Sequence, residues 1–341
     1  MQNYSKPCHV ENRRKPHKAN EGFTIIELLI VIVVIAILAA LSVVSFSGIQ
    51  NRARVSSRQA EIAQWKKLSE SHKIQQGIEC PHNFAFVYAN SALGTTDFCV
   101  MKYEAKNVGG VPTSQPSGLP WNGTTQAQAA AAANSTCAGC RLISDIEWMA
   151  IAADVLTVKY NWSGGDVASG YIYSGHNDNA PANALAASVD DADGYSGTGN
   201  SETTGANQRR TLYLKSGDVV WDMAGNLSEW TSHAQAMSNA GITGESSWTW
   251  REWTTSGLSY GNIPSYARHN NFAGIVGLPA LSSWNSTKGI GQFHSNYSDT
   301  AVRPFIRGGT YYDGAIAGIL KLYLGSSPTG SPQPNGFRVT K

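Results

Sequence analysis

The feature that most constrains this chain is an apolar segment close to its N-terminus. Residues 23–44 read FTIIELLIVIVVIAILAALSVV, which is 22 residues with one charged side chain, Glu27. As a helix rising ~1.5 Å per residue, this segment would extend roughly 33 Å and could cross a bilayer. Residues 1–22 carry five Lys and Arg against two Asp and Glu. This bias predicts a cytoplasmic leader, and it places everything after residue 44 outside the cell.

A buried core helix and a cleaved secretory signal are the alternatives for this segment. No small-residue cleavage site followed by a break ends the apolar run, and a helix-compatible pattern without Pro continues over 45–76. We therefore expect a single membrane pass that continues as one helix and stops at Gly77. Val55, Ile62, Trp65 and Leu68 form an apolar stripe on that helix, which we expect to pack on the outer domain of the same chain.

The string GFTIIEL at residues 22–28 resembles the type IV pilin and pseudopilin family. The resemblance implies that a prepilin peptidase cuts after Gly22 and that Phe23 becomes a methylated N-terminal residue. It also implies that Glu27 pairs with the N-terminal amine of a neighbouring subunit, which would supply the partner that a carboxylate inside an apolar span needs. The expected partners are therefore the peptidase and other pilin subunits. The expected location is the cell membrane or a type IV pilus-like filament.

Beyond residue 80 the sequence predicts an α+β domain with long loops. Short apolar strings alternate with Gly, Asn, Ser and Pro, and two stretches are helical: Thr125–Asn134 and Ser144–Val155, the second opening with a Ser144/Glu147 capping box. Segments 161–210 and 231–300 are interpreted as ordered loop insertions, in which the Trp residues are either core or rim. Lys and Arg number 21 against 22 Asp and Glu after residue 22 and form no long run after the helix, so a nucleic-acid partner is not expected.

Four cysteines follow the apolar segment: Cys80, Cys99, Cys137 and Cys140. An even number in an exported domain favours disulfides. We favour local pairing, Cys80 with Cys99 across a strand-turn-strand and Cys137 with Cys140. Crossed pairing, and zinc or redox chemistry at the Cys137–Cys140 motif, remain open as alternatives.

Four strings then resemble one family: FCVMKYE at 98–104, RLISDIEW at 141–148, VWDMAGNLSEW at 220–230 and GFR at 336–338. The family is that of sulfatase-modifying factors, which includes the formylglycine-generating enzyme. The resemblance implies a C-type-lectin-like fold over residues 80–341. The formylglycine-generating members use a cysteine pair near the C-terminus, and residues 309–341 contain neither Cys nor His. We therefore expect no enzyme activity.

The third string also suggests a metal site. Asp222, the carbonyls of Gly225 and Leu227, and Glu229 provide an all-oxygen set around a Gly turn, which suits Ca²⁺. In the family, the corresponding positions bind a structural calcium. The alternative is that Asp222 and Glu229 cap turns and pair with an arginine.

The C-terminal segment 307–338 is interpreted as a binding surface. Apolar framework residues alternate with Tyr, Asp, Ser and Gly, a mixture typical of antibody loops. The candidate contact residues are Tyr311, Tyr312, Asp313, Ile316, Lys321, Tyr323, Gly325, Ser326 and Ser327. Tyr residues would supply contact area, Asp313 and Lys321 charge complementarity, and the serines hydrogen bonds. The alternative is an ordinary strand with a solvated polar face.

The same segment resembles the variable region of lectin-fold proteins that are targets of diversity-generating retroelements. There, adenines in Asn codons are mutagenised, and six of the candidate residues can be reached from an Asn codon by changing adenines alone: Tyr312, Asp313, Ile316, Tyr323, Gly325 and Ser326. The sequence thus favours a surface-displayed, receptor-like or adhesin-like protein that binds an extracellular protein or glycan. The alternatives are a structural minor pilin or pseudopilin and, less favoured, a formylglycine-generating-type enzyme.

Overall fold

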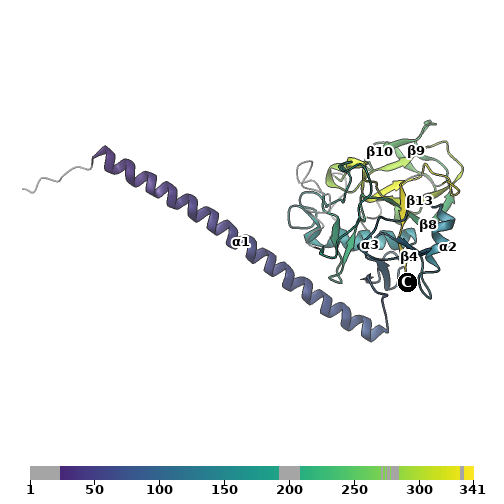
Figure 1. Ribbon diagram of the computed structural model, residues 1–341. Coiled ribbons are helices and arrows are strands. Elements are labelled where there is room, and N and C mark those ends of the chain that lie inside the picture. The colour runs from purple at the N-terminus through teal and green to yellow at the C-terminus, as the bar shows by residue number, and fades with distance from the viewer. Residues whose placement is uncertain are drawn as a thin grey trace, which may run out of the picture. The chain divides into compact units, whose positions relative to one another are not determined.

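The computed structural model describes residues 24–191, 208–269, 272, 274, 277, 284–330 and 334–341, without the side chains of 42–48 and 51. It contains two compact units, Met1–Ala60 and Glu61–Lys341, each of which is described by itself. The helix α1 (Ile25–Gln76) begins in the first unit and ends in the second (Figure 1). The predicted cleavage residues Gly22 and Phe23 lie outside the described residues.

Local sequence sets both ends of α1. At the start, the backbone N and the Oγ1 of Thr24 each donate a 2.8 Å hydrogen bond to Glu27 Oε2, and Glu27 N donates back to Thr24 Oγ1. At the end, Gly77 follows with φ +66°, a left-handed conformation that terminates helices readily. Within the described ranges, no helix is both long and apolar enough to cross a membrane. Of the span predicted over 23–44, Phe23 and the side chains of 42–44 lie outside these ranges.

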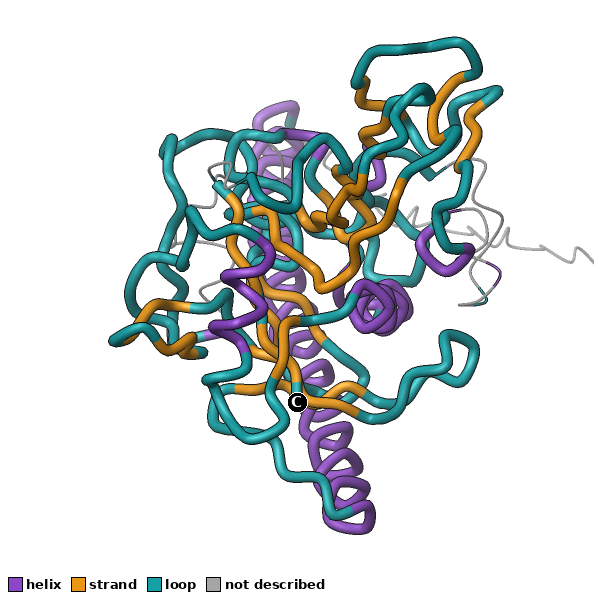
Figure 2. The backbone as a smooth tube through the Cα atoms, turned by 90° about the vertical axis from the view of Figure 1, so that its right-hand side faces the viewer, coloured by secondary structure: helices purple, strands orange, loops and turns teal. Residues whose placement is uncertain are grey.

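The second unit is an α+β domain built around two larger sheets (Figure 2). The six-stranded sheet has the order β10 (Thr249–Arg251), β12 (Phe293–Ser295), β14 (Gly318–Tyr323), β13 (Val302–Gly308), β8 (Ser228–Ala236), β15 (Asn335–Phe337). The four-stranded sheet has the order β1 (Phe84–Val87), β2 (Phe98–Met101), β16 (Val339–Thr340), β5 (Arg141–Leu142). The C-terminal segment therefore supplies strands to both sheets.

Smaller elements complete the unit. Two-stranded sheets pair β3 (Lys106–Val108) with β4 (Val111–Thr113), β6 (Thr211–Tyr213) with β7 (Val219–Trp221), and β9 (Ala240–Ile242) with β11 (Leu258–Tyr260). The 3₁₀ turns among the described residues include η1 (Lys159–Asn161), η3 (Ser265–Ala267), η5 (Ser286–Lys288) and η6 (Gly314–Ile316). Segment 231–300 was expected to be loops, but it contains β9, β10, β11 and β12. These strands have three residues each and Gly-rich connections, so the sequence contains little of the alternation that identifies a strand.

The two predicted helices of the domain are confirmed. Helix α2 (Gln126–Ala133) and helix α3 (Asp145–Thr157) each begin at a capping box, with Thr125 and Ser144 as the N-cap residues. Helix α3 is buried on most of its surface, and its Trp148 Nε1 donates to the carbonyl of Ile319 in β14 at 2.9 Å. This contact attaches the main helix of the core to the strand that follows the predicted binding turn.

The part of α1 that belongs to the second unit packs on the domain through both polar and aromatic contacts. Glu61 Oε2 lies 3.0 Å from Lys159 Nζ, Ser69 Oγ donates to the carbonyl of Ser216 at 3.0 Å, and His72 Nε2 lies 2.6 Å from Asp97 Oδ2. Of the predicted apolar stripe, Trp65 does contact the ring of Tyr160, but Leu68 is 58% exposed. The stripe prediction is therefore wrong at Leu68, because the docking face is rotated toward the polar residues.

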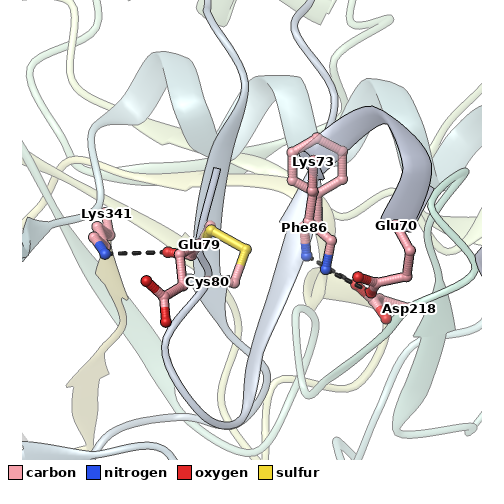
Figure 3. Close-up of a disulfide and its surroundings, with 8 residues drawn as sticks. Glu70, Lys73, Glu79, Cys80, Phe86, Asp218 and Lys341 are labelled. Carbon is pink, nitrogen blue, oxygen red and sulfur yellow. Dashed lines mark hydrogen bonds and ion pairs between the residues drawn. A yellow bond between two sulfur atoms is a disulfide. The ribbon is translucent and has the colours of Figure 1, made fainter. Parts of the chain in front are cut away.

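Both local disulfides form, Cys80–Cys99 and Cys137–Cys140, so the preferred pairing is confirmed. The first closes the β1–β2 hairpin, whose register pairs Phe86 with Cys99. Close to this disulfide, Lys341 Nζ donates to the carbonyl of Glu79 at 3.1 Å, and Phe86 N donates to Asp218 Oδ2 at 2.9 Å (Figure 3). The start and the end of the domain are thus joined at one place.

Candidate functional site

The two carboxylates of the predicted calcium site, Asp222 and Glu229, form buried ion pairs. Asp222 accepts hydrogen bonds from Arg210 Nε and Nη2, both at 2.7 Å. Glu229 accepts two from Arg338 Nε, at 2.8 and 3.0 Å. The turn between them is as tight as expected, with Gly225 at φ +85° and Asn226 at φ +63°.

These residues do not fit a calcium ion. The arginine hydrogen bonds occupy one lone pair on each oxygen of these carboxylates, and each carboxylate charge is already neutralised in a buried site, so Ca²⁺ would have to compete with a paired arginine. Within the described part of the chain, no group of three or more His, Cys, Asp and Glu side chains could hold a metal ion. The arginine-pairing alternative describes Asp222 and Glu229 as the structure has them, and a calcium ion at this turn stays a prediction.

Sequence reasoning missed a third carboxylate in this region, Glu104. Its side chain is buried, and it accepts hydrogen bonds from Leu227 N at 3.0 Å and from Asn226 Nδ2. Burial, followed by repulsion from the Asp222 carboxylate, raises the pKa of Glu104. Glu104 ends the first of the four quoted strings, which was the available signal.

The four strings meet at Arg338. Besides Glu229, this guanidinium donates to the carbonyls of Met101, Lys102 and Trp221, and its own backbone carbonyl accepts from Ile143 N at 3.2 Å. Segments separated by more than 200 residues are therefore held by one buried side chain. The structure therefore supports a structural role for these four strings, which is to hold distant segments of the domain together.

The predicted binding segment divides into a buried framework and an outer set. The framework residues that alternate along it are all buried: Ala317, Ile319, Leu320, Leu322 and Leu324. In the outer set, Tyr312 is 49% exposed and Ser327 is exposed, whereas Tyr311, Asp313, Ile316, Tyr323 and Gly325 are half-buried. Two predicted contact residues are buried instead, Lys321 at 3% and Ser326 at 6% exposure.

Lys321 and Asp313 neutralise each other. Lys321 Nζ donates to Asp313 Oδ2 at 2.5 Å and to Ser228 Oγ at 2.9 Å, and it lies 5.1 Å from the ring centroid of Trp250. Asp313 Oδ2 also accepts from Thr310 N at 2.8 Å. Burial lowers the pKa of Lys321, and the facing Asp313 carboxylate opposes that effect. This pair is not free to complement a ligand's charge, so that predicted role is corrected: the pair holds the turn 310–317 against β14.

Four aromatic rings lie together and form what we call the aromatic platform. They are Trp250 of β10, His294 of β12, Tyr323 of β14, and Trp248, which comes just before β10. His294 stacks on Tyr323 with ring centroids 4.7 Å apart and on Trp248 at 5.3 Å, and Trp250 stacks on Tyr323 at 5.6 Å. Both Trp residues and Tyr323 are half-buried. Burial, followed by the charges of Lys321 and Arg251, lowers the pKa of His294 to about 4, so this ring is neutral at physiological pH.

The Trp residues of segment 231–300 were predicted to lie either in the core or at a rim, and the structure contains both kinds. Trp248 and Trp250 form part of the platform beside the predicted residue Tyr323, whereas Trp253 and Trp284 are buried in the core. The available signal was the two-residue spacing of Trp248 and Trp250, which places both side chains on one face of an extended strand. Sequence reasoning could not locate that face beside Tyr323.

The turn before β14 joins the two predicted sites. Tyr311 N donates to the carbonyl of Asn226 at 2.9 Å, and the Tyr311 ring stacks on His176 with centroids 6.0 Å apart. Tyr312 packs edge-on against Tyr311, at 5.0 Å between centroids. The loop first assigned to calcium therefore supports the turn that carries the most exposed tyrosine.

Comparison with known proteins identifies one sequence motif. Residues 17–43 match the family described as "Prokaryotic N-terminal methylation motif", which confirms the prepilin-type character of the N-terminus. No curated protein matches the chain. Among solved structures, the chain is similar to "Major Tropism Determinant P3c Variant", with 13% identity and a TM-score of 0.32, and to "Major Tropism Determinant I1 Variant", with 11% identity and a TM-score of 0.30. Each match covers 76% of this chain and 52%, about half, of the other protein.

Proposed function

We propose that this chain is a pilin-like surface protein whose outer domain displays a ligand-binding face. The N-terminal methylation motif supports processing by a prepilin peptidase and anchoring through residues 23–44, in the cell membrane or in a pilus-like filament. In this proposal, the domain lies outside the cell and has a C-type-lectin-like fold. The mechanism is recognition without bond breaking.

The observation that carries the proposal is the distribution of burial in the C-terminal segment. The apolar framework residues of this segment are buried, whereas Tyr312 is 49% exposed. Tyr323 is half-buried and lies in the aromatic platform beside Trp248 and Trp250. Tyr and Trp supply large contact areas at a low entropic cost, and they dominate binding hot spots. The Lys321–Asp313 pair and the stacked rings hold this face in one conformation before any ligand arrives.

The direct test compares Tyr312→Ala with Leu119→Ala, which truncates another exposed apolar side chain outside the face. Cells displaying each variant would be applied to arrays of extracellular proteins and glycans. We expect Tyr312→Ala to weaken binding of the wild-type ligand at least tenfold at unchanged surface expression, and Leu119→Ala to leave it unchanged. Equal binding by the two variants would reject the face.

We further propose that the segment is diversified by a retroelement, and the structure sharpens the expected pattern. Deep sequencing of the gene in a population of the source organism should show variation at codons such as 312 and 316, with Gly308, Gly309 and residues 336–338 fixed. Asp313 is reachable from an Asn codon, but it should stay constant, because its loss would strand the buried charge of Lys321. An invariant segment would leave a binding protein of fixed specificity.

A structural minor pilin is the second candidate, because the methylation motif is shared by subunits that only assemble. The two functions separate by phenotype. The structural role predicts that cells lose their filaments when the gene is deleted. It also predicts that cells carrying Tyr312→Ala adhere normally.

A further inference from the structure

A cavity of about 490 Å³ lies between the C-terminal part of α1 and the end of α3. Glu61 and Trp65 line it from α1, Val158 from the position after α3, and Val167 and Lys215 from two loops. All of these residues belong to the second unit. The volume is within the range of ~300–1,000 Å³ that is typical of small-molecule sites.

The lining of this cavity includes an apolar part that the protein does not cover completely. Val158 is buried, and the half-buried ring of Trp65 packs on Tyr160 with ring centroids 5.9 Å apart. Val167 lines the same cavity but is 37% exposed. An apolar group of a ligand that lies between Trp65 and Val167 would remove this surface from water, which favours binding.

Two charged side chains of the lining neutralise each other. Glu61 Oε2 lies 3.0 Å from Lys159 Nζ, and it also accepts from Tyr160 Oη at 2.5 Å. A ligand would therefore have to break an existing pair to use either charge. These two residues define one side of the cavity and contribute little to the choice of ligand charge.

The lining also contains one anion and one cation, Asp166 and Lys215, and both are exposed. Within the part of the chain that the structure describes, neither side chain makes a hydrogen bond or an ion pair, with the other or with a third residue. The charge of Lys215 acts on the buried Asp154 carboxylate without forming an ion pair with it. The cavity thus offers a ligand one group of each sign.

We propose that this cavity binds a small zwitterion with an apolar side chain, of the class of free amino acids and dipeptides. The carboxylate of the ligand would face Lys215, its ammonium group would face Asp166, and its side chain would lie between Trp65 and Val167. An anion or a cation would gain only one of the two attractions. The cavity shares no residue with the proposed binding face, so the proposal does not rest on the proposed function.

The test uses the full chain in a nonionic detergent, with calorimetry and saturation-transfer NMR as the measurements. The probes are L-phenylalanine and L-leucyl-L-phenylalanine. Each is compared with its N-acetyl form, which has no ammonium group, and with its C-terminal amide, which has no carboxylate. We expect at least one zwitterion to bind with a millimolar or lower Kd. Each of its capped forms should bind more weakly by a factor of about three or more, as for the loss of a solvent-exposed ion pair.

Binding by neither zwitterion, or equal binding of a capped form, would overturn the proposal. A cavity-filling substitution then locates the site. Val167→Trp should weaken the zwitterion at least tenfold, whereas Val189→Trp, at another exposed valine of the second unit, should not. Full affinity in Val167→Trp would contradict the assignment to this cavity.

Charge removal tests the orientation of the ligand. Lys215→Gln and Asp166→Asn should each weaken the zwitterion by about threefold, with the exposed Lys67→Gln and Glu79→Gln as controls. Lys215→Gln should also abolish the preference for the zwitterion over its amide, because the carboxylate then has no cation to face. A preference that persists in Lys215→Gln would contradict the proposed orientation. Array binding that depends on Tyr312 is measured separately, so failure of the cavity leaves the proposed binding face intact.

Discussion

In the second unit, one group of charged side chains is buried, whereas one group of aromatic side chains is half-exposed. Three arginines, Arg210, Arg307 and Arg338, are fully buried, and each is paired with a buried carboxylate through at least two hydrogen bonds. The rings of the aromatic platform, by contrast, remain half-exposed apart from His294. Both groups are exceptions, because other rings of the unit, such as Trp148, Trp221 and Trp230, fill the core as expected.

The buried ion pairs and the half-exposed rings have different structural roles. A buried pair adds little net stability, but the loss of one partner is costly, so the pairs make the arrangement of their strands all-or-none. The rings contribute contact area that no neighbour covers completely. The buried charges thus hold the scaffold, and the half-exposed rings are the surface to which the proposed function assigns a ligand.

Arg338→Met tests the scaffold and should have the largest effect. It leaves the Glu229 carboxylate buried without its partner, so we expect the free energy of unfolding to fall by about 3–5 kcal/mol. Urea denaturation followed by tryptophan fluorescence would measure it. Lys159→Met, which breaks a partly exposed pair with Glu61, should cost less than about 1 kcal/mol. Equal losses would mean that burial does not distinguish the two pairs.

The platform should weaken in acid through His294. Its folded pKa of about 4 lies below the ordinary value of 6.5, so the unfolded chain binds the proton first. The stabilising contribution is complete above about pH 6.5 and is lost as the pH falls toward 4. His294→Gln should therefore reduce the stability lost between pH 7 and pH 5 by about 2 kcal/mol relative to wild type.

His82→Gln, at an exposed position, provides the control for that pH series. Buried carboxylates such as Asp154, whose pKa burial raises to about 6, change stability in the opposite direction. The informative quantity is therefore the difference between variant and wild type at each pH. Identical profiles for His294→Gln and wild type would show that the ring stays solvated.

Truncation of Tyr323, in the aromatic platform, should lower stability more than truncation of Tyr312, in the turn before β14. Tyr323 stacks on two rings, so Tyr323→Ala should lower the unfolding free energy by about 1–2 kcal/mol. Tyr312 is half in solvent, and Tyr312→Ala should cost less than about 0.5 kcal/mol. Thermal unfolding of both proteins measures this. A larger cost at Tyr312 would place that residue in the core and remove it from the face.

Calcium should have the smallest effect. Because arginines hold both Asp222 and Glu229, 5 mM CaCl₂ should change the Tm by less than about 1 °C relative to the protein in EDTA. A rise of several degrees would show that Ca²⁺ can displace an arginine and would restore the original interpretation of the loop.

Much of the local structure could be predicted. The capping boxes at Thr125 and Ser144, the helix end at Gly77 and the two local disulfides all depend on residues close in the chain. The burial of the framework residues Ile319, Leu320, Leu322 and Leu324 was also indicated by their apolar side chains. The long-range pairings could not be predicted: Arg338 is 109 residues from Glu229, and Lys321 is 93 residues from Ser228.

The sequence by itself determined where helices begin, which segments are framework and that the N-terminus carries a prepilin-type motif, because propensity and short motifs act over a few residues. Only the tertiary structure decided what the polar groups do. A carboxylate has the same sequence signature whether it meets a calcium ion or an arginine, and a tryptophan has the same signature in a core or on a platform. The choice depends on which strands the sheet brings together, and that is settled by the packing of the whole domain.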